Sequence, residues 1–160
     1  MLDELRTLAG DASKPEDAAE AKRILEAVDR WAKERLDEAR AMEEVTPKGA
    51  KKLYEAAAKR LTGLEPGDAA AARLKDPTFL RELEAWDRLE RMARAEEAVK
   101  AVAGAKRVVT DGKFAQANQG PLGTIVGEGR LLVARYADTR AAVSARATLE
   151  RYGISTGAAK

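Results

Sequence analysis

Carboxylate side chains recur at helical spacing in this chain, and they are the first groups to consider for acid–base chemistry. The pairs are Glu34 with Glu38, Glu82 with Glu84, and Glu96 with Glu97. A paired-carboxylate site needs two acids that face one pocket and have different environments. Here each pair lies among lysines and arginines, so intrahelical ion pairs explain the pattern better. We expect structural carboxylates and a chain that is not an enzyme.

The chain contains no histidine and no cysteine. Histidine is the side chain that most often transfers protons near pH 7, and both residues are common ligands of transition metals. The missing cysteines also exclude disulfides and thiolate nucleophiles, but they leave the redox compartment open. We therefore expect no catalytic residue, no metal ion and no cofactor.

Four glycines cluster at Gly120, Gly123, Gly127 and Gly129. A phosphate-binding loop needs glycines followed by a lysine and a hydroxyl residue at fixed spacing. No such pair follows, and the nearest cation is Arg130. We expect instead that Gly123 and Gly127 let a neighbouring helix pack closely, so that replacing Gly127 by leucine lowers the melting temperature.

The five large aromatic residues at helical positions are predicted to be structural. Trp31 and Trp86 lie on apolar stripes, which favours a place in the core over ligand stacking. Tyr54, Tyr136 and Tyr152 are typical of helix-end anchors whose hydroxyls reach water.

The net charge of +2 is unevenly placed, with −3 over residues 1–104 and +5 over residues 105–160. Both parts can be solvated helix faces; alternatively, the basic part docks on an acidic surface of the same chain or of a second copy. A candidate partner surface consists of Arg130, Arg135, Arg140, Arg146 and Arg151. Nucleic acid would require a denser patch with exposed aromatics, so polyanion or nucleic-acid binding is only the alternative.

The composition predicts an all-α fold of antiparallel helical hairpins. Charged residues make up 35% of the chain and aromatics 4%, and the common residues are those that lose little rotamer freedom in helices. The predicted helices are a short one ending at Gly10, then 15–44, 47–62, 67–75, 77–103, 121–136 and 138–152. Ser13 is expected to form a capping box before the second, and Thr46 to cap the third.

Two segments are less regular. Residues 105–119 are compatible with one more helical turn or a short extended piece, and Ser155–Lys160 is expected to fray. The stripe predicted to face the core in the second helix is Ile24, Leu25, Val28, Trp31, Ala32, Ala39 and Met42.

The order of elements repeats along the chain. Thr46-Pro47-Lys48-Gly49 aligns with Gly120-Pro121-Leu122-Gly123. In both places a long helix precedes a proline-initiated helix and an alanine-rich helix. We expect one helical domain, 1–160, composed of two units at about 13–76 and 77–154 and stacked as a bundle or a short array.

The stretch from Ala134 to Gly153 resembles the helix junction of tetratricopeptide-type repeats, in which an aromatic residue ends one helix and an alanine-rich helix packs back. Gly112–Ala117 is similar to their inter-helix turn. The layout also resembles helical regions beside thioredoxin-like domains in exported bacterial proteins. The resemblance implies a protein-binding scaffold. It implies no redox role, because no Cys-x-x-Cys is present, and the repeat length departs from the usual ~34 residues.

No segment is long and apolar enough to span a membrane, and Met1–Leu5 is too acidic for a signal peptide. We expect an exported protein if a signal lies upstream, and a cytoplasmic one otherwise. The function predicted from the sequence is a non-catalytic helical scaffold that mediates protein–protein interaction or self-assembly.

Overall fold

The computed structural model describes residues 2–156, and in this range it contains eight α-helices and no strand. Their bounds are α1 Leu2–Ala9, α2 Pro15–Val45, α3 Pro47–Arg60, α4 Glu65–Arg73, α5 Pro77–Glu97, α6 Gly112–Ala117, α7 Gln119–Arg135 and α8 Arg140–Arg151. The predicted all-α class is confirmed. Most of the segment expected to fray, residues 157–160, lies outside the described residues.

The chain forms two compact units, Met1–Asp76 and Pro77–Lys160. The first contains α1–α4 and the second contains α5–α8. A duplication relating the two units stays a prediction.

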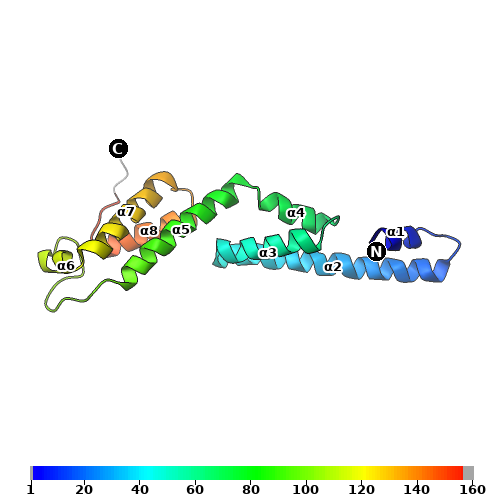
Figure 1. Cartoon of the computed structure of the whole chain (residues 1–160), viewed down its shortest axis with the longest axis horizontal. Coiled ribbons are helices and arrows are strands. Elements are labelled where there is room, and N and C mark those ends of the chain that lie inside the picture. The colour runs from blue at the N-terminus through cyan, green and yellow to red at the C-terminus, as the bar shows by residue number, and fades with distance from the viewer. Residues whose placement is uncertain (1, 157–160) are drawn as a thin grey trace. The chain divides into compact units, whose positions relative to one another are not determined.

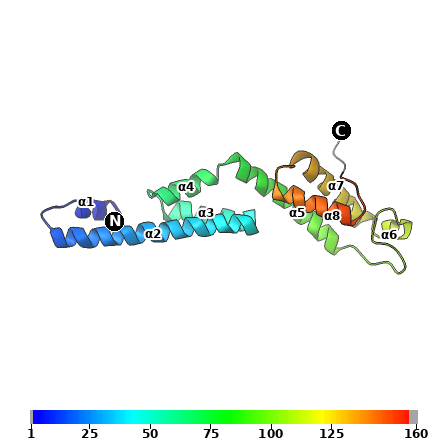
Figure 2. The ribbon, with the colours of Figure 1, turned by 180° about the vertical axis from the view of Figure 1, so that it is seen from behind.

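The N-terminal unit is built on α2, whose 31 residues extend about 46 Å at 1.5 Å per residue. α3 returns alongside it, while α1 folds back over its first turns (Figures 1 and 2). Small residues dominate the buried positions: Ala18, Ala21, Ala32, Leu36 and Ala39 of α2, and Ala50, Tyr54 and Ala57 of α3. Alanine faces let helix axes approach closely, so this unit has a thin core.

The start of α2 differs from the predicted capping box. Its N-cap is Lys14, which makes no side-chain capping hydrogen bond. Ser13 instead donates its hydroxyl and its backbone N–H to Asp11, at 2.6 and 2.9 Å. Those hydrogen bonds lower the pKa of Asp11. The helix begins at Pro15, whose fixed φ suits the first helical position.

The C-terminal unit is a three-helix arrangement of α5, α7 and α8. α7 runs antiparallel to both neighbours. α8 runs parallel to α5, as two ion pairs show: Glu82 pairs with Arg140 near the start of both helices, and Glu96 pairs with Arg151 near their ends. Its fully or nearly fully buried core comprises Ala85, Met92, Phe114, Leu122, Ile125, Leu132, Tyr136, Ala141, Ala145, Leu149, Tyr152 and Ile154.

The helix predicted over 77–103 ends at Glu97, and residues 98–111 form an irregular connection. Asn118, 1% exposed, holds this connection. Its amide nitrogen donates to the Lys100 carbonyl at 2.9 Å, and its amide oxygen accepts the Lys100 N–H at 2.7 Å. Asp111 then caps α6 by accepting the N–H groups of Lys113 and Phe114. Tertiary hydrogen bonds thus replace the last turns of the predicted helix.

The predicted packing role of Gly123 and Gly127 is wrong. A methyl group at either position would meet nothing within 4 Å. Gly129 is the closely packed glycine, because a Cβ there would lie 2.8 Å from Cδ2 of Leu149. One face of α7 therefore meets α8 through Gly129, while Gly123 and Gly127 face open space.

This difference gives a matched pair of variants. Gly127→Ala should raise the free energy of unfolding by about 0.5–1 kcal/mol, because alanine orders a helix at lower entropic cost. Gly129→Ala should lower it, because an added methyl in a packed core costs about 1–3 kcal/mol. Thermal melts followed by circular dichroism measure both. Shifts of the same sign would contradict this packing.

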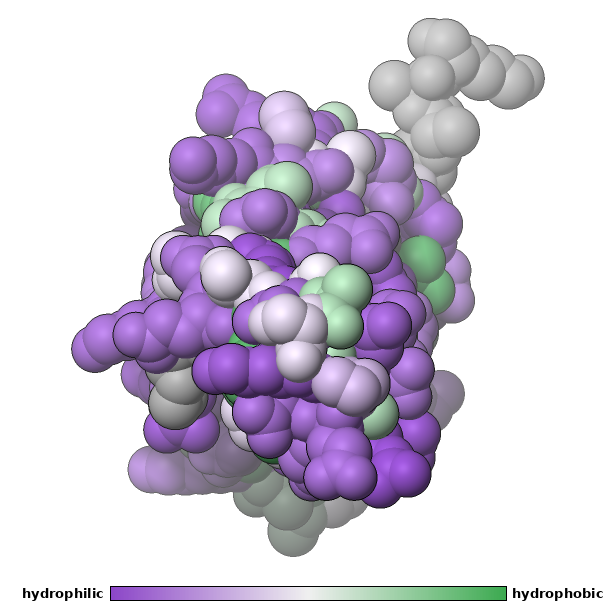
Figure 3. Space-filling view, turned by 90° about the vertical axis from the view of Figure 1, so that its right-hand side faces the viewer, coloured by the Kyte–Doolittle hydropathy of each residue, from purple (hydrophilic) through white to green (hydrophobic). Residues whose placement is uncertain are grey.

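No helix among the described residues is both long and apolar enough to cross a membrane. The face seen in Figure 3 is largely hydrophilic, with small hydrophobic patches scattered over it. Five large hydrophobic side chains in the described part of the chain are nevertheless exposed: Ile24, Trp31, Val45, Leu80 and Val143.

Candidate protein-docking groove

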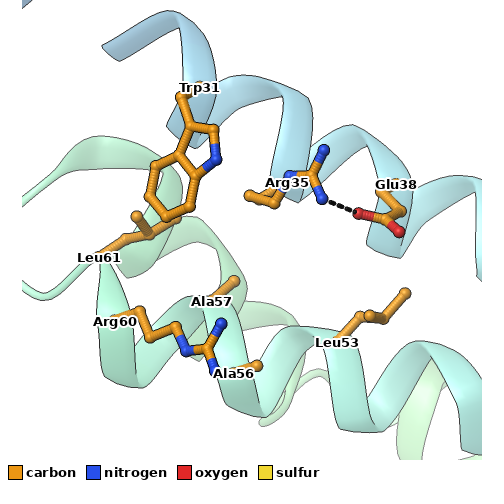
Figure 4. A pocket seen from close by; sticks show the side chains of 8 residues that line it. All are labelled: Trp31, Arg35, Glu38, Leu53, Ala56, Ala57, Arg60 and Leu61. Carbon is orange, nitrogen blue, oxygen red and sulfur yellow. Dashed lines mark ion pairs between the residues drawn. The ribbon is translucent and has the colours of Figure 1, made fainter. Parts of the chain in front are cut away.

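A groove runs between α2 and α3 in the N-terminal unit, with a volume of about 160 Å³. Its lining residues are Trp31, Arg35, Glu38, Leu53, Ala56, Ala57, Arg60 and Leu61. Figure 4 shows Trp31 above Leu61 at one end and Leu53 with Glu38 at the other. The floor is apolar and the rim is charged, which is the usual anatomy of a surface that binds another helix.

Trp31 is 45% exposed, so its predicted place in the core is wrong. Ala32, the next residue, is fully buried. Successive helix residues point about 100° apart, and Ala32 takes the position that faces the core. Trp86, in the other unit, is partly buried.

Trp31 belongs to a second apolar stripe on α2, which we call the outer stripe. Its members follow steps of three and four residues, and all are exposed: Ile24, Ala27, Trp31, Glu34, Glu38, Ala41 and Val45. Three of the five exposed large hydrophobic side chains lie on it. Apolar residues at this spacing form the seams along which helices associate. α2 thus has one seam facing the unit's own core and another facing solvent.

The charges at the groove belong to both helices. Arg35 pairs with Glu38 within α2 at 2.8 Å, which is the intrahelical ion pair predicted for Glu38. Arg60, on the opposite rim, forms no ion pair with any described residue. Glu34, on the outer stripe, is also exposed and has no ion-pair partner within residues 2–156, so the intrahelical ion pair predicted for it is wrong. Arg60 on the groove rim and Glu34 on the outer stripe thus offer a partner one cation and one anion that are not neutralised internally.

A second hollow, between α2, α3 and α4, is lined by a hydrogen-bonded network of Glu43, Tyr54 and Arg73. Glu43 accepts from the Tyr54 hydroxyl at 2.5 Å and from Arg73 Nε and a terminal nitrogen at 2.9 and 2.7 Å. Arg73 also pairs with Asp76 at 3.3 Å. Partial burial and the Glu43 carboxylate raise the pKa of Tyr54 to about 12. We interpret this network as a latch that joins three helices.

Tyr54 and Tyr152 do not match their predicted roles as anchors with hydroxyls in water. Tyr54 lies within α3, is 1% exposed, and donates its hydroxyl to Glu43. Tyr152 is 2% exposed and donates to Glu96 at 3.4 Å. Tyr136 is 7% exposed, and the guanidinium group of Arg81 lies 5.1 Å from its ring centre. All three tyrosines are part of the packing.

The arginines of the predicted partner surface lie on α7 and α8, and they have different environments. Arg140 and Arg151 pair with Glu82 and Glu96 of α5, at 3.5 and 3.2 Å. The side chains of Arg130, Arg135 and Arg146 are exposed and form no ion pair with a described residue. Two of the five cations are thus neutralised inside the C-terminal unit, which weakens the basis for polyanion binding.

The other carboxylate pairs were expected to make intrahelical ion pairs, and for Glu82 and Glu96 this is wrong. Both carboxylates reach across to α8, and Glu82 also accepts the backbone N–H of Arg140 at the start of that helix, at 3.3 Å. Within residues 2–156, no group of three or more acidic residues is arranged to hold a metal ion.

The groove was not predicted from the sequence, although two signals for it are present there. Ile24, Trp31 and Val45 are separated by multiples of seven residues, which places them on one helix face. α3 carries five lysines and arginines against one glutamate, which marks it as a basic helix beside an acidic one.

No family model, no curated protein and no solved structure matches the chain. The groove, the outer stripe and their charges are therefore the features from which a function can be inferred.

Proposed function

We propose that this chain is a non-catalytic helical scaffold that mediates protein–protein interaction or self-assembly, and that the α2–α3 groove binds a helix of the partner. The observation that carries the proposal is the exposure of Trp31 beside an apolar hollow. Tryptophan is among the residues that contribute most to binding energy in protein interfaces. A folded chain gains nothing from leaving such a side chain in water, whereas a docked helix would cover it.

The outer stripe supports a helix as the docking element. It extends from Ile24 to Val45, a length of about 32 Å, which matches a helix of some six turns better than a small ligand. The hollow beside it is lined from both helices, by Trp31, Arg35 and Glu38 of α2 and by residues of α3 (Figure 4). Helix-in-groove recognition uses anchors at such three- and four-residue steps.

The resemblance to tetratricopeptide-type repeats supports the same role, because such repeats are generally protein-binding scaffolds. Membership of that family stays a prediction. The proposal does not depend on it, since the groove and the outer stripe are features of this chain's own residues.

Tryptophan fluorescence tests whether the groove is open. The Trp86→Phe variant leaves Trp31 as the only tryptophan, and the Trp31→Phe variant leaves Trp86 as a matched control. In dilute protein, we expect Trp31 to emit at longer wavelength and to be quenched by acrylamide more strongly than the partly buried Trp86. A Trp31 that is less accessible than Trp86 in the dilute chain would leave no open groove to bind a partner.

A further inference from the structure

We infer that the helix covering the outer stripe is supplied by a second copy of this chain, so that the two α2–α3 hairpins pack face to face as a four-helix dimer. The inference rests on the proposed function and names its partner. Four observations carry it. The charges of α2 and α3 are opposite, and Trp31 projects beside a hollow on the same surface. The unpaired charges of Glu34 and Arg60 lie at the same level along the helices, and the exposed face of the hairpin is large enough for an interface.

The charges of the two helices are complementary. α2 has ten acidic and six basic residues, a net charge of −4, whereas α3 has five basic residues and one acidic residue, a net charge of +4. The outer stripe of α2 contains Glu34 and Glu38. Three exposed cations of α3, Lys52, Lys59 and Arg60, form no ion pair with a described residue, whereas Lys51 pairs with Glu55 within the helix. An α2 helix is therefore a suitable partner for α3.

Charge also selects the symmetry of the dimer. Two hairpins can meet face to face around a two-fold axis that runs either along or across the helices. An axis across the helices would place α2 on α2 and α3 on α3, and like charges would oppose each other. An axis along the helices places each α2 on the partner's α3. We therefore propose the second arrangement, in which the two α2 helices run parallel.

The same surface provides both a projection and a hollow. Trp31 stands half-exposed at one side of the groove, and the hollow beside it is lined by Leu53 and Ala56. With the axis along the helices, each residue of the outer stripe keeps its level along the bundle and faces the partner's α3. The seven-residue spacing of Ile24, Trp31, Glu38 and Val45 then repeats once per layer, as in parallel helical assemblies.

The unpaired charges lie at matching levels. Arg60 lies beside Leu61 at the Trp31 end of the groove (Figure 4), near the level of residues 31–35 of α2. Rotation about an axis along the helices preserves this level. Glu34 of one copy therefore faces Arg60 of the other, and this contact forms twice in a symmetric dimer.

The available area fits a dimer of modest stability. The face is about two helix widths, or roughly 20 Å, across along the 14 residues of α3, a length of about 21 Å. It is one helix wide over the remaining ~11 Å of the outer stripe, which gives about 500 Å² on each copy. The total of about 1,000 Å² is at the lower limit for a specific interface. We expect association on the order of micromolar concentration that weakens with salt, because exposed charge pairs are screened.

Sedimentation velocity of the full chain over a range of concentrations, at low and high salt, tests the inference. The wild-type chain should dimerise at low salt and dissociate more readily at high salt. Glu34→Lys and Arg60→Glu should each weaken the dimer by roughly ten-fold, because each creates two like-charge contacts. Glu26→Lys has the same charge change on the same helix away from the outer stripe, and it should leave the dimer unchanged. Circular dichroism verifies that every variant is folded.

Mixing gives the sharpest test. An equimolar mixture of the Glu34→Lys and Arg60→Glu chains restores opposite charges at both contacts, so it should dimerise as well as wild type. The double variant should do the same. Failure of both rescues would overturn the proposed arrangement.

The remaining outcomes separate the two proposals. A wild-type chain that stays monomeric at every concentration, with Trp31 open to quencher, overturns the second copy but leaves the docking function intact. A monomer in which Trp31 is already shielded overturns both.

Discussion

Replacing Asn118 by leucine should lower the free energy of unfolding of the C-terminal unit by about 2–4 kcal/mol. The Asn118 side chain is nearly fully buried, and its amide makes three hydrogen bonds, two with Lys100 and one with the Phe114 carbonyl. Leucine has a similar size but forms none of them. The Phe114 carbonyl would then lose a partner inside the protein, and residues 98–106 would lose their attachment to the start of α7.

Denaturant unfolding of the Trp31→Phe background measures this effect, because Trp86 of α5 then reports on the C-terminal unit alone. Gln119→Ala, at the exposed neighbouring position, is the matched control and should change stability by less than about 0.5 kcal/mol. Equal effects of Asn118→Leu and Gln119→Ala would show that the Asn118 hydrogen bonds do not hold the connection. Proteolysis gives a second measurement: residues 98–111 should be cleaved faster in Asn118→Leu than in Gln119→Ala.

Replacing Glu43 by alanine should destabilise the N-terminal unit by roughly 2–3 kcal/mol. Removing one partner of a fully buried ion pair costs about 3–5 kcal/mol, and the smaller value is expected here because the side chains of Glu43 and Arg73 keep 14% and 34% of their exposure. The Tyr54 hydroxyl would also lose its acceptor. Denaturant unfolding followed through Trp31, in the Trp86→Phe background, measures the change.

Two further variants separate the parts of this latch. Tyr54→Phe removes only the hydroxyl and should cost about 1 kcal/mol. In the double variant Glu43→Leu with Arg73→Met, both charges are absent, and much of the lost stability should return, because no buried charge is left unpaired. If the double variant loses as much stability as the single variants Glu43→Leu and Arg73→Met lose together, Glu43 and Arg73 act independently.

The helices could be predicted because their starting points have local causes. Pro15, Pro47 and Pro77 each begin a helix in the structure, at the positions where their fixed φ predicted one. The end of α5 could not be predicted in this way. Residues 98–103 are compatible with a helix on their own, and Asn118, which is distant in the sequence, captures the backbone of Lys100. Such an ending depends on the tertiary structure.

The groove was harder to predict because both faces of α2 carry apolar residues. The predicted stripe combined Ala32, which is buried, with Trp31, which is exposed. The size of its apolar side chain favoured tryptophan over alanine for the core, but the buried positions of α2 are taken by Leu36 and by alanines. The choice between the two seams depends on the packing distance, which the sequence does not specify.

The glycines show the same limit at finer scale. Gly127 and Gly129 are two residues apart, so they point to different sides of α7. Spacing alone favoured Gly123 with Gly127, whereas Leu149 of α8 approaches Gly129. Which glycine is packed depends on where the next helix lies.

The proposed docking role depends most directly on whether solvent reaches Trp31 in the dilute chain and is excluded from it on association. Acrylamide quenching of the Trp86→Phe chain should be strong in dilute protein and should fall as the concentration rises through the range in which the chain associates. In the same experiment, a Trp86→Phe chain that also carries Glu34→Lys should show strong quenching of Trp31 at every concentration. Shielding of Trp31 already at the lowest concentration would contradict an open docking groove on this protein.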